Sequence, residues 1–407
     1  MFFVVGSDGN GFFTFFTCGN VENCKASKMT AFSPNFKIGI LGGGQLGRML
    51  IQSAVNFNLD VAVLDPDPEA PCRDLCKRFV NGSFQDFQTV YDFGKTVDLL
   101  TIEIENVNVA ALKRLRDEGR MIFPQPEVIE IIQDKGTQKE FLKQNGLPTA
   151  DFILVKNRAE LSQHKDFLPA VQKLRVAGYD GRGVFKIKNT KDIENAFDAP
   201  SVLEKHVPFV KEIAVMAVRS PSGEVKTFPA VEMIFHPTAH LVDFLFSPAK
   251  ISPKIEAKAR DLALKAVKAL GIVGLLAVEM FITADDDVLI NEMAPRPHNS
   301  GHHTIEANVV SQFEAHWRAI LDLPLGDTGA RVPAVMVNIL GAEGHSGPAR
   351  YEGLDEVLAM DGVSLHLYGK KLTKPFRKMG HITVTDVDLE SAMAKAKKVK
   401  NTLKVVT

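Results

Sequence analysis

The sequence predicts an α/β protein whose first domain is a doubly wound parallel sheet and whose larger remainder is α+β. Strand and helix patterns alternate from residue 37 to about 132, short strands then follow closely on one another, and residues after about 326 are strand-rich. Alternation indicates parallel βαβ units, and closely spaced strands indicate antiparallel hairpins. A chain of 407 residues has room for two or three such domains.

Composition limits the classes of function. The chain is 45% hydrophobic and 24% charged, with a net charge of −1, so nothing general favours binding to nucleic acid or to a membrane surface. An apolar run of about 18 or more residues, which a transmembrane helix needs, is lacking. Four cysteines do not form a disulfide framework, so we expect a soluble protein of the reducing cytoplasm.

Residues 1–36 differ in composition from the rest of the chain. They are rich in Phe and Gly and have neither a basic start nor a clear cleavage site, which argues against a secretory signal. We predict a flexible N-terminal extension, with Met29 as an alternative to Met1 for the native start.

The first strand, turn and helix carry a glycine motif. The segment KIGILGGGQLGR at 37–48 places Gly42, Gly44 and Gly47 in a G-x-G-x-x-G pattern, followed by a helix to Phe57 and a second strand that ends on Asp65. This arrangement is typical of dinucleotide sites, where an acid follows about 20 residues later. The same turn binds other phosphates through free N–H groups, or simply lets strand and helix pack closely. NAD is therefore one interpretation among three.

Further strands and helices are predicted along the chain. A strand in TVDLLTIEIEN and a helix in VAALKRLRDEG complete the first domain, and a helix pair in 123–152 stops at Gly146 and Pro148. Short strands around PAVQKL, GVFKI, SVLEKHV, EIAVMAVRS and TFPAVEM predict antiparallel pairs, and a helix over 254–271 precedes a last hairpin, GLLAVEMFI and DVLINEMA.

That last hairpin carries two carboxylates. A turn centred between Asp285 and Asp286 places Glu279 opposite Glu292 on the neighbouring strand. Facing like charges repel, so a cation is expected between them, and carboxylates that share phosphate oxygens suit Mg²⁺. Asn291 would add a ligand oxygen only if the strand twists inward. The alternative is a solvated sheet edge.

Two further segments suggest a nucleotide site. The loop between the strands of VQKLRVAGYDGRGVFKI carries Lys173, Arg175 and Arg182 among three glycines, which is typical of a phosphate-binding lid or of a plain turn. In SVLEKHVPFVKEIAV, Glu204 and Glu212 suit a purine edge and a ribose, or are surface charges.

The segment NEMAPRPHNSGHHTIEAN concentrates polar donors beside the acid pair. Arg296, His298, Asn299, Ser300 and His302 suit the stabilisation of an oxyanion or phosphoryl group. Zinc is disfavoured, because the spacing of the available side chains fits no zinc motif; these are His298, His302 and His303, the pair Cys72 and Cys76, and the pair His236 and His240.

Taken together, these motifs resemble the ATP-grasp ligases and, more narrowly, the N5-carboxyaminoimidazole ribonucleotide synthetase family. The resemblance runs from about residue 37 to the C-terminus and depends on GILGGGQLGRML, GYDGRG, NEMAPRPHNSGH and YGK…RKMGH. It implies a Rossmann-like preATP-grasp domain at 37–132, an ATP-grasp domain of two α+β lobes at 133–325 and a small strand-rich C-terminal domain at 326–407.

The resemblance also implies a reaction of de novo purine biosynthesis. ATP, with Mg²⁺, drives the joining of bicarbonate to the amine of 5-aminoimidazole ribonucleotide (AIR) through carboxyphosphate, giving N5-carboxyaminoimidazole ribonucleotide, ADP and phosphate. A homodimer that passes its product to a separate mutase is implied, with no nucleic-acid or membrane partner.

Residue roles follow from the matching positions. The nucleotide is expected to contact Lys135, Lys173, Gly178, Gly181, Gly183, Glu204, Lys205, Val207, Glu212 and Asn291, and Mg²⁺ is expected at Glu279 and Glu292. Bicarbonate and the AIR amine are expected at Tyr179, Asp180, Arg182, Arg296, His298 and Asn299. AIR itself is expected at Gln45, Leu46, Glu105, Lys370, Arg377 and Lys378, with Glu103 a weaker candidate than Glu105.

This interpretation keeps the glycine turn as a source of free N–H groups, but for AIR and not for NAD. Asp65 becomes an ordinary acid at a strand end. An NAD oxidoreductase and a non-catalytic nucleotide-binding protein remain as the competing classes.

Overall fold

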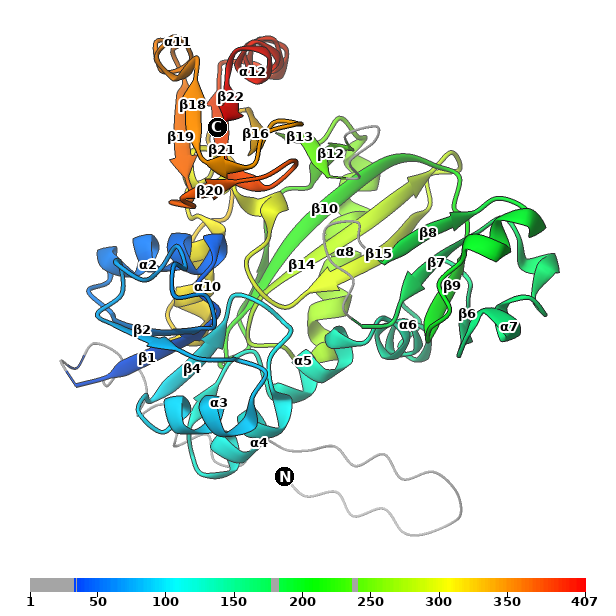
Figure 1. Ribbon diagram of the computed structural model, residues 1–407, viewed down its shortest axis with the longest axis horizontal. Coiled ribbons are helices and arrows are strands. Elements are labelled where there is room, and N and C mark those ends of the chain that lie inside the picture. Colours follow the sequence, from blue (N-terminus) through cyan, green and yellow to red (C-terminus); the bar gives the residue numbers. More distant parts are fainter. Residues whose placement is uncertain (1–32, 34, 177–182, 236–240) are drawn as a thin grey trace.

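A computed structural model describes residues 33, 35–176, 183–235 and 241–407 of the chain (Figure 1). Three bodies surround a central sheet: the N-terminal domain, a small four-stranded lobe on the opposite side, and a C-terminal lobe above both. Within the described residues, no helix is both long and apolar enough to cross a membrane.

The N-terminal domain is a five-stranded parallel sheet in the order β3-β2-β1-β4-β5, which confirms the predicted βαβ series. Its strands are β1 (Lys37–Leu41), β2 (Asp60–Asp65), β3 (Arg78–Asn81), β4 (Leu99–Ile102) and β5 (Met121–Ile122). Its helices are α2 (Gln45–Asn56), α3 (Phe87–Gly94), α4 (Val109–Asp117) and α5 (Pro126–Gln133). β1 and β4 are neighbours, so the residues that come directly after them meet at one edge of the sheet.

The small lobe is a four-stranded antiparallel sheet in the order β6-β9-β7-β8, as the closely spaced strands predict. It follows α6 (Lys135–Gln144) and contains β6 (Phe152–Val155), α7 (Arg158–Leu161), η1 (Lys165–Phe167), β7 (Ala170–Leu174), β8 (Val184–Ile187), η2 (Thr190–Asn195) and β9 (Ser201–Lys205). β7 and β8 pair directly and flank the predicted glycine loop.

The central sheet has nine strands, eight of them in the order β15-β14-β10-β12-β13-β16-β21-β19, with β11 on β10. They are β10 (Phe209–Arg219), β11 (Val225–Thr227), β12 (Val231–Phe235), β13 (Val242–Ser247), β14 (Gly274–Thr283), β15 (Val288–Ala294), β16 (Ala334–Leu340), β19 (Val363–Leu367) and β21 (Lys378–Thr385). Because β13 pairs with β16, the sheet continues from the ATP-grasp region into the C-terminal lobe without a break.

Helices and short strands complete the fold. α8 (Pro253–Leu270) ends at Gly271, whose φ of 62° suits a left-handed helix cap, and packs on β10 through an apolar face. The remaining elements are η3 (Asn299–Gly301), α9 (Thr304–Ala307), α10 (Gln312–Ile320), β17 (Gly347–Pro348), β18 (Arg350–Glu352), α11 (Leu354–Leu358), β20 (Leu372–Thr373), α12 (Leu389–Thr402) and β22 (Lys404–Val406).

Buried contacts hold the N-terminal domain against the central sheet. Trp317 on α10 is fully buried in a core shared with α2, and its indole Nε1 donates to the Leu50 carbonyl at 2.9 Å. On the preceding residue, the His316 Nε2 lies 2.9 Å from the Thr101 hydroxyl of β4. These contacts hold α2 and β4 of the N-terminal domain against α10.

We predict that Trp317→Phe lowers the free energy of unfolding by about 1–3 kcal/mol, because it removes a buried hydrogen bond and leaves a cavity. Urea unfolding followed by circular dichroism measures this, since Trp317 is the chain's single tryptophan and its fluorescence is lost. Val55→Ala on the exposed face of α2 is the control, with an expected change below about 0.5 kcal/mol. Equal effects of the two substitutions would contradict this account of the interface.

Candidate active site

The β14–β15 hairpin positions the acid pair by means of a β-bulge. Glu279 does pair with Glu292, as predicted, but the turn is centred differently. Nearer the turn, Ile282 pairs with Val288 and Met280 pairs with Ile290, which centres the turn on Asp285. A bulge between Glu279 and Met280 then inserts one extra residue in β15 and restores the predicted pairing.

The extra residue is Asn291. Because a bulge breaks the alternation of side chains, Asn291 and Glu292 both project toward the site. The Lys173 ammonium donates to Asn291 Oδ1 at 2.8 Å, which shows that this side chain turns inward. Asn291 therefore meets the condition that the sequence left open.

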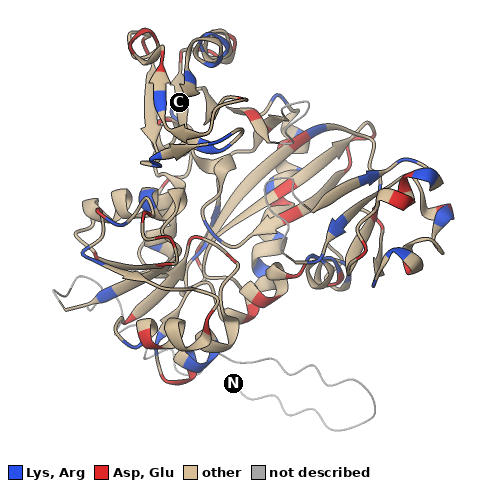
Figure 2. Cartoon of the chain, in the orientation of Figure 1, with Lys and Arg blue, Asp and Glu red and all other residues tan. Residues whose placement is uncertain are grey.

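A third carboxylate lies on the same face. On β10, Ala214 pairs with Glu279 and Glu212 pairs with Phe281, so Glu212 projects beside Glu279. Burial raises the pKa of Glu212 to about 8, with the Glu279 charge adding to the shift. The pKa of Glu279 is raised to about 7 by burial and then by Glu292. In Figure 2, acidic positions lie on neighbouring strands of this sheet.

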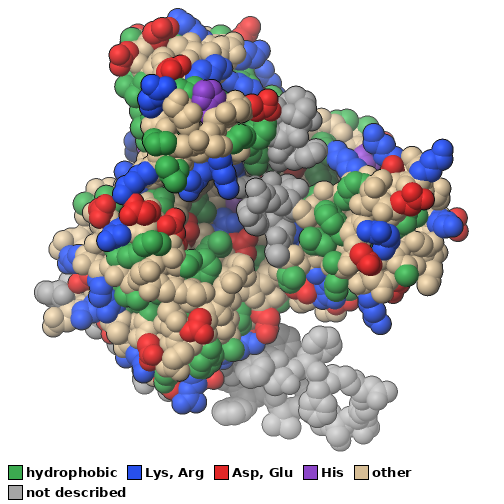
Figure 3. Space-filling model, in the orientation of Figure 1, with side chains coloured by type: hydrophobic (Ala, Val, Ile, Leu, Met, Phe, Trp, Pro, Cys, Tyr) green, Lys and Arg blue, Asp and Glu red, His purple; other side chains and the backbone are tan. Residues whose placement is uncertain are grey.

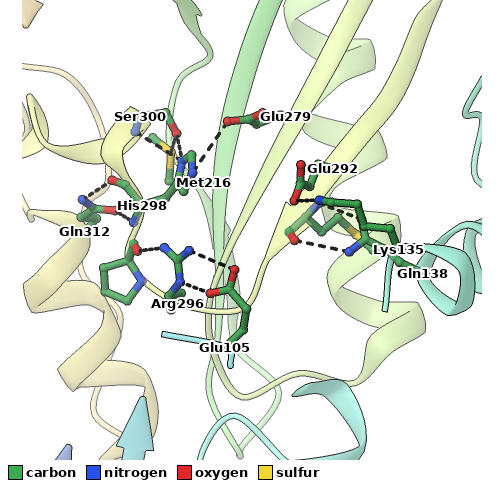
Figure 4. Close-up of polar contacts among 12 residues, drawn as sticks. Glu105, Lys135, Gln138, Met216, Glu279, Glu292, Arg296, His298, Ser300 and Gln312 are labelled. Atoms are coloured by element: carbon green, nitrogen blue, oxygen red, sulfur yellow. Dashed lines mark hydrogen bonds and ion pairs between the residues drawn. The ribbon is translucent and has the colours of Figure 1, made fainter. Parts of the chain in front are cut away.

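Lysines oppose part of that charge. Lys135, at the start of α6, donates to Glu292 Oε1 (Figure 4). Burial alone would raise the pKa of Glu292, but Lys135 and Lys173 bring it below its usual value. Glu279 makes no such contact with a lysine among the described residues. One acid of the pair is thus neutralised and the other is not.

The buried carboxylate of Glu204 forms ion pairs with two lysines. Its side chain is 5% exposed and lies 3.0 Å from the Lys173 ammonium and 3.3 Å from that of Lys139. Burial lowers the pKa of Lys139 to about 8, with Lys173 adding to the shift. Sequence reasoning missed Lys139, although its spacing of four from Lys135 places both on one helix face.

In the segment expected to bind adenine, the side chains of Glu204 and Lys205 are already bonded to other groups of the protein. The Glu204 carboxylate is committed to lysines, and the Lys205 ammonium donates to the carbonyls of Phe167 and Leu168 at 3.1 and 3.2 Å. Val207 follows β9 and is half-buried. A purine edge at this segment would thus meet backbone groups.

The loop after β15 places Arg296 and His298 beside the acid pair (Figure 4). The Arg296 guanidinium binds both Glu105 oxygens, at 2.5 and 3.2 Å. Burial would raise the pKa of Glu105, but Arg296 lowers it to about 2. This ion pair joins the N-terminal domain to the loop.

His298 is held by its backbone and its ring. The Gln312 amide accepts from the His298 N–H at 2.9 Å and donates to its carbonyl at 2.8 Å. The ring Nδ1 lies 2.8 Å from the Ser300 hydroxyl, and Nε2 lies 3.7 Å from Glu279 Oε1. Burial, and then Arg296, lower the pKa of His298 to about 4, so the imidazole is neutral at pH 7. Gln312 was not identified from the sequence.

Asn299 is buried beside His298. Within the described part of the chain, neither its Oδ1 nor its Nδ2 has a hydrogen-bond partner. Buried amides are nearly always satisfied, so this side chain is suited to a ligand.

The side chains considered for zinc have other surroundings. The buried ring of His302 packs against His381, and Cys72 Sγ donates to the Gly44 carbonyl at 3.6 Å. Among the described residues, no group of three or more His, Cys, Asp or Glu could hold a metal ion.

One of the residues expected at the AIR phosphate, Lys370, meets Gln45 across the domains. Lys370 donates to Gln45 Oε1 at 3.1 Å and to the Lys378 carbonyl at 2.7 Å, and Arg377 donates to the Leu372 carbonyl at 2.8 Å. Lys and Arg side chains gather where the C-terminal lobe meets the N-terminal domain, beside a hollow in the surface (Figure 3).

The glycine turn corrects one expectation. The N–H groups of Gly44, Leu46 and Gly47 are not free, because all three donate to the Glu103 carboxylate. Asp65 accepts from the Gly43 N–H at 2.6 Å, so it also holds the turn and is more than a strand-end acid. A pyrophosphate at this turn would have to displace Glu103.

Several predicted residues lie outside the described ranges. They are Gly178, Tyr179, Asp180, Gly181 and Arg182 of the glycine loop, His236 and His240, and the N-terminal segment with Met1 and Met29. Gly183 is described, with a φ of 77°.

Comparison with known families matches three successive regions of the chain. Residues 36–133 match the ribonucleotide synthetase preATP-grasp domain, residues 140–313 the ATP-grasp domain, and residues 334–395 the phosphoribosylaminoimidazole carboxylase C-terminal domain. These matches confirm the three-domain architecture that the resemblance implies.

Solved structures of individual proteins are similar to this chain over most of its length. The crystal structure of N5-carboxyaminoimidazole ribonucleotide synthetase from Thermotoga maritima is 47% identical, with a TM-score of 0.85 over 91% of this chain and 99% of that chain. The Aspergillus clavatus synthase in complex with ADP and 5-aminoimidazole ribonucleotide is 37% identical, with a TM-score of 0.82 over 90% of this chain and 98% of that chain.

A longer relative is the phosphoribosylaminoimidazole carboxylase of Saccharomyces cerevisiae, which is 41% identical over 85% of this chain. The chain spans 63% of the length of that protein.

The raised carboxyl pKa values predict how stability depends on pH. Glu279 and Glu212 bind protons more tightly in the folded state than in the unfolded state, so their contribution to the free energy of unfolding should fall as pH rises from about 5 to about 8, whereas buried His298, whose pKa is lowered, contributes in the opposite direction. Glu279→Gln should remove about 2–3 kcal/mol of that fall. Urea unfolding of the nucleotide-free protein across this range measures it.

The matched control is Glu390→Gln on the exposed first turn of α12. It should retain the wild-type dependence on pH. Parallel curves for the wild type and Glu279→Gln would show that the acid pair is not desolvated as described.

Proposed function

The chain belongs to the N5-carboxyaminoimidazole ribonucleotide synthetase family, and we propose that it joins bicarbonate to the amine of AIR with cleavage of ATP. The products are N5-carboxyaminoimidazole ribonucleotide, ADP and phosphate, in de novo purine biosynthesis. The structure of the A. clavatus synthase with ADP and AIR supports the choice of substrates.

The observation that carries the proposal is the meeting of three groups of side chains at the β14–β15 hairpin. Carboxylates come from the central sheet, lysines from α6 and β7, and an arginine and a neutral histidine from the loop after β15. Carboxylates beside lysines suit a metal-bound triphosphate, and the adjoining Arg296 and His298 suit a small anion and an amine.

Mg²⁺ fits the acid pair. Glu279 and Glu292 are facing carboxylates on a partly desolvated face, and burial followed by the Glu292 charge raises the pKa of Glu279. We assign Mg²⁺ to these two residues, where it would neutralise phosphate charge. Lys135 and Lys173 are assigned to the phosphates, Asn291 and the ribose-facing Glu212 to the nucleotide, and the backbone of Glu204, Lys205 and Val207 to the adenine.

The proposed chemistry has two steps. A bicarbonate oxygen attacks the γ-phosphorus, the bond to ADP breaks, and carboxyphosphate forms. Carboxyphosphate then breaks down to carbon dioxide and phosphate, which leaves with the electron pair of the broken C–O bond, and the AIR amine nitrogen bonds to the carbon of carbon dioxide and loses a proton. Arg296 and Asn299 are assigned to the anion, and His298, whose ring is neutral, is assigned beside the amine.

AIR is assigned to the junction of the N-terminal domain and the C-terminal lobe. Gln45, Leu46 and Glu105 approach from one side, and Lys370, Arg377 and Lys378 from the other. The Gln45–Lys370 contact supports this placement. Three cations suit the dianionic phosphate of AIR. Tyr179, Asp180 and Arg182 remain predictions from the resemblance.

The two competing classes are less well supported. An NAD oxidoreductase would need the turn that Glu103 already occupies. A non-catalytic nucleotide-binding protein would not need Arg296, His298 and Asn299 beside the acid pair. A cytoplasmic homodimer that hands its product to a separate mutase stays a proposal that rests on the family resemblance.

ADP release should require ATP, Mg²⁺, bicarbonate and AIR together for full rate, because transfer to the amine completes the reaction. Glu292→Gln should lower kcat at least about 100-fold, since it removes a charge that binds the metal. A coupled assay of ADP, with each substrate omitted in turn, measures both.

Glu232→Gln serves as the control, because Glu232 lies on the central sheet but pairs with Lys211. Its kcat should stay within about twofold of wild type. ATP cleavage at the full rate without AIR and bicarbonate would refute the proposed substrates, and near-normal turnover of Glu292→Gln would refute the metal assignment.

A further inference from the structure

The glycine turn before α2 faces the C-terminal lobe through one side chain. Gln45 is the first residue of α2, and its Oε1 accepts from Lys370 at 3.1 Å. Leu46 is buried behind it. Whatever holds this turn therefore positions Gln45 against Lys370, one of the residues assigned to the AIR phosphate.

Glu103 holds the turn from inside. Its Oε1 accepts from the Gly44 N–H at 3.0 Å, and its Oε2 accepts from the N–H groups of Leu46 and Gly47 at 3.1 and 3.0 Å. These are N–H groups that a helix start leaves without partners, and a carboxylate there also favours the helix dipole. An internal anion thus occupies the position that a bound phosphate takes in dinucleotide sites.

The same carboxylate lies close to the backbone of two glycines of the motif, which leaves little room for a Cβ at either position. A Cβ on Gly42 would lie 2.6 Å from Glu103 Cγ, and a Cβ on Gly44 would lie 2.8 Å from Glu103 Oε1. The Gly42 backbone is left-handed, with a φ of 96°, but Gly44 has a φ of −75° that any residue adopts. At Gly44, therefore, a Cβ would displace the Glu103 carboxylate.

Glu103 is also linked to the second half of the site. It directly follows β4, and Glu105, two residues on, binds Arg296 through both oxygens. One short segment therefore touches the AIR-facing turn at one end and the loop of Arg296 and His298 at the other.

We propose that Glu103 is a positioning residue for AIR: it holds the Gly44–Gly47 turn so that Gln45 faces Lys370, and it does not touch AIR itself. This inference rests on the proposed function. It gives the two neighbouring acids different roles. The Glu105 side chain is partly exposed and pairs with Arg296 of the site, whereas every described hydrogen bond of the Glu103 carboxylate is with the turn.

The first test is a comparison of Michaelis constants. In Glu103→Gln, the amide NH₂ faces N–H donors, so the turn should shift. The KM for AIR should rise at least about tenfold, while the KM for ATP stays within about twofold, because the nucleotide residues lie on other elements. Unchanged KM for AIR, or an equal rise for ATP, would overturn the proposal.

The second test is a double-mutant cycle with Gly44→Ala. In the wild type, the added methyl must push the Glu103 carboxylate off its N–H donors, so the KM for AIR should rise about tenfold. In Glu103→Ala, which removes the obstacle, the same methyl should change that KM by less than about twofold. Independent effects of the two substitutions would contradict the account, and Gly44→Ala alone keeps it testable if the Glu103 variants do not fold.

Amide hydrogen exchange provides a readout that does not depend on activity. Exchange in the peptide covering residues 42–49 should accelerate in Glu103→Gln, whereas Asp86→Ala, which removes the α3 cap of the same domain, should leave that peptide unchanged. Failure of the wild type to need AIR refutes the proposed function. A wild type that needs AIR, with unchanged exchange and KM in Glu103→Gln, refutes this inference alone.

Discussion

The repulsion between carboxylates on neighbouring strands is the constraint on which the rest of the site depends. Glu279, Glu292 and Glu212 share one face of the central sheet, and the bulge at Asn291 is what brings two consecutive side chains of β15 onto it. Lys135 and Lys173 compensate Glu292, and Glu204 in turn fixes Lys173 and Lys139 from beneath. Burial, and then the Glu292 charge, raise the pKa of Glu279, and no lysine among the described residues contacts its carboxylate, so this acid suits a cation.

The same principle, an internal charge that holds a functional group in place, recurs at the domain junction. Glu103 occupies the N-terminus of α2, and Glu105 occupies the guanidinium of Arg296. Neither contact is a surface ion pair, and both span segments far apart in the chain. The buried contacts of Trp317 and His316 hold the domain that presents them. The site is thus assembled from bodies that are joined by a shared apolar core, by a continuous sheet and by these polar contacts (Figure 1).

Much of this could be predicted from residue patterns, for reasons that are local. Strand and helix periodicity is a property of neighbouring residues, so the parallel sheet and the hairpins were predictable, as was the pairing of Glu279 with Glu292. The bulge could not be predicted. A turn centred on Asp285 with one extra residue in β15 pairs Glu279 with Glu292, and so does a turn centred between Asp285 and Asp286 with no extra residue. Contacts such as Glu103 with the turn, Lys139 with Glu204 and Gln312 with His298 join distant segments and depend on tertiary packing. Glu103 had one usable signal, since it directly follows the strand next to β1.

We propose above all that Glu279 and Glu292 hold a cation that carries the phosphates of the nucleotide. Isothermal titration of ADP, with Mg²⁺ and with a chelator, measures how strongly the two ligands support each other's binding. The account predicts that Mg²⁺ tightens ADP binding at least about tenfold in the wild type and by less than about twofold in the Glu279→Gln, Glu292→Gln double variant. An equal gain from Mg²⁺ in both proteins would contradict it.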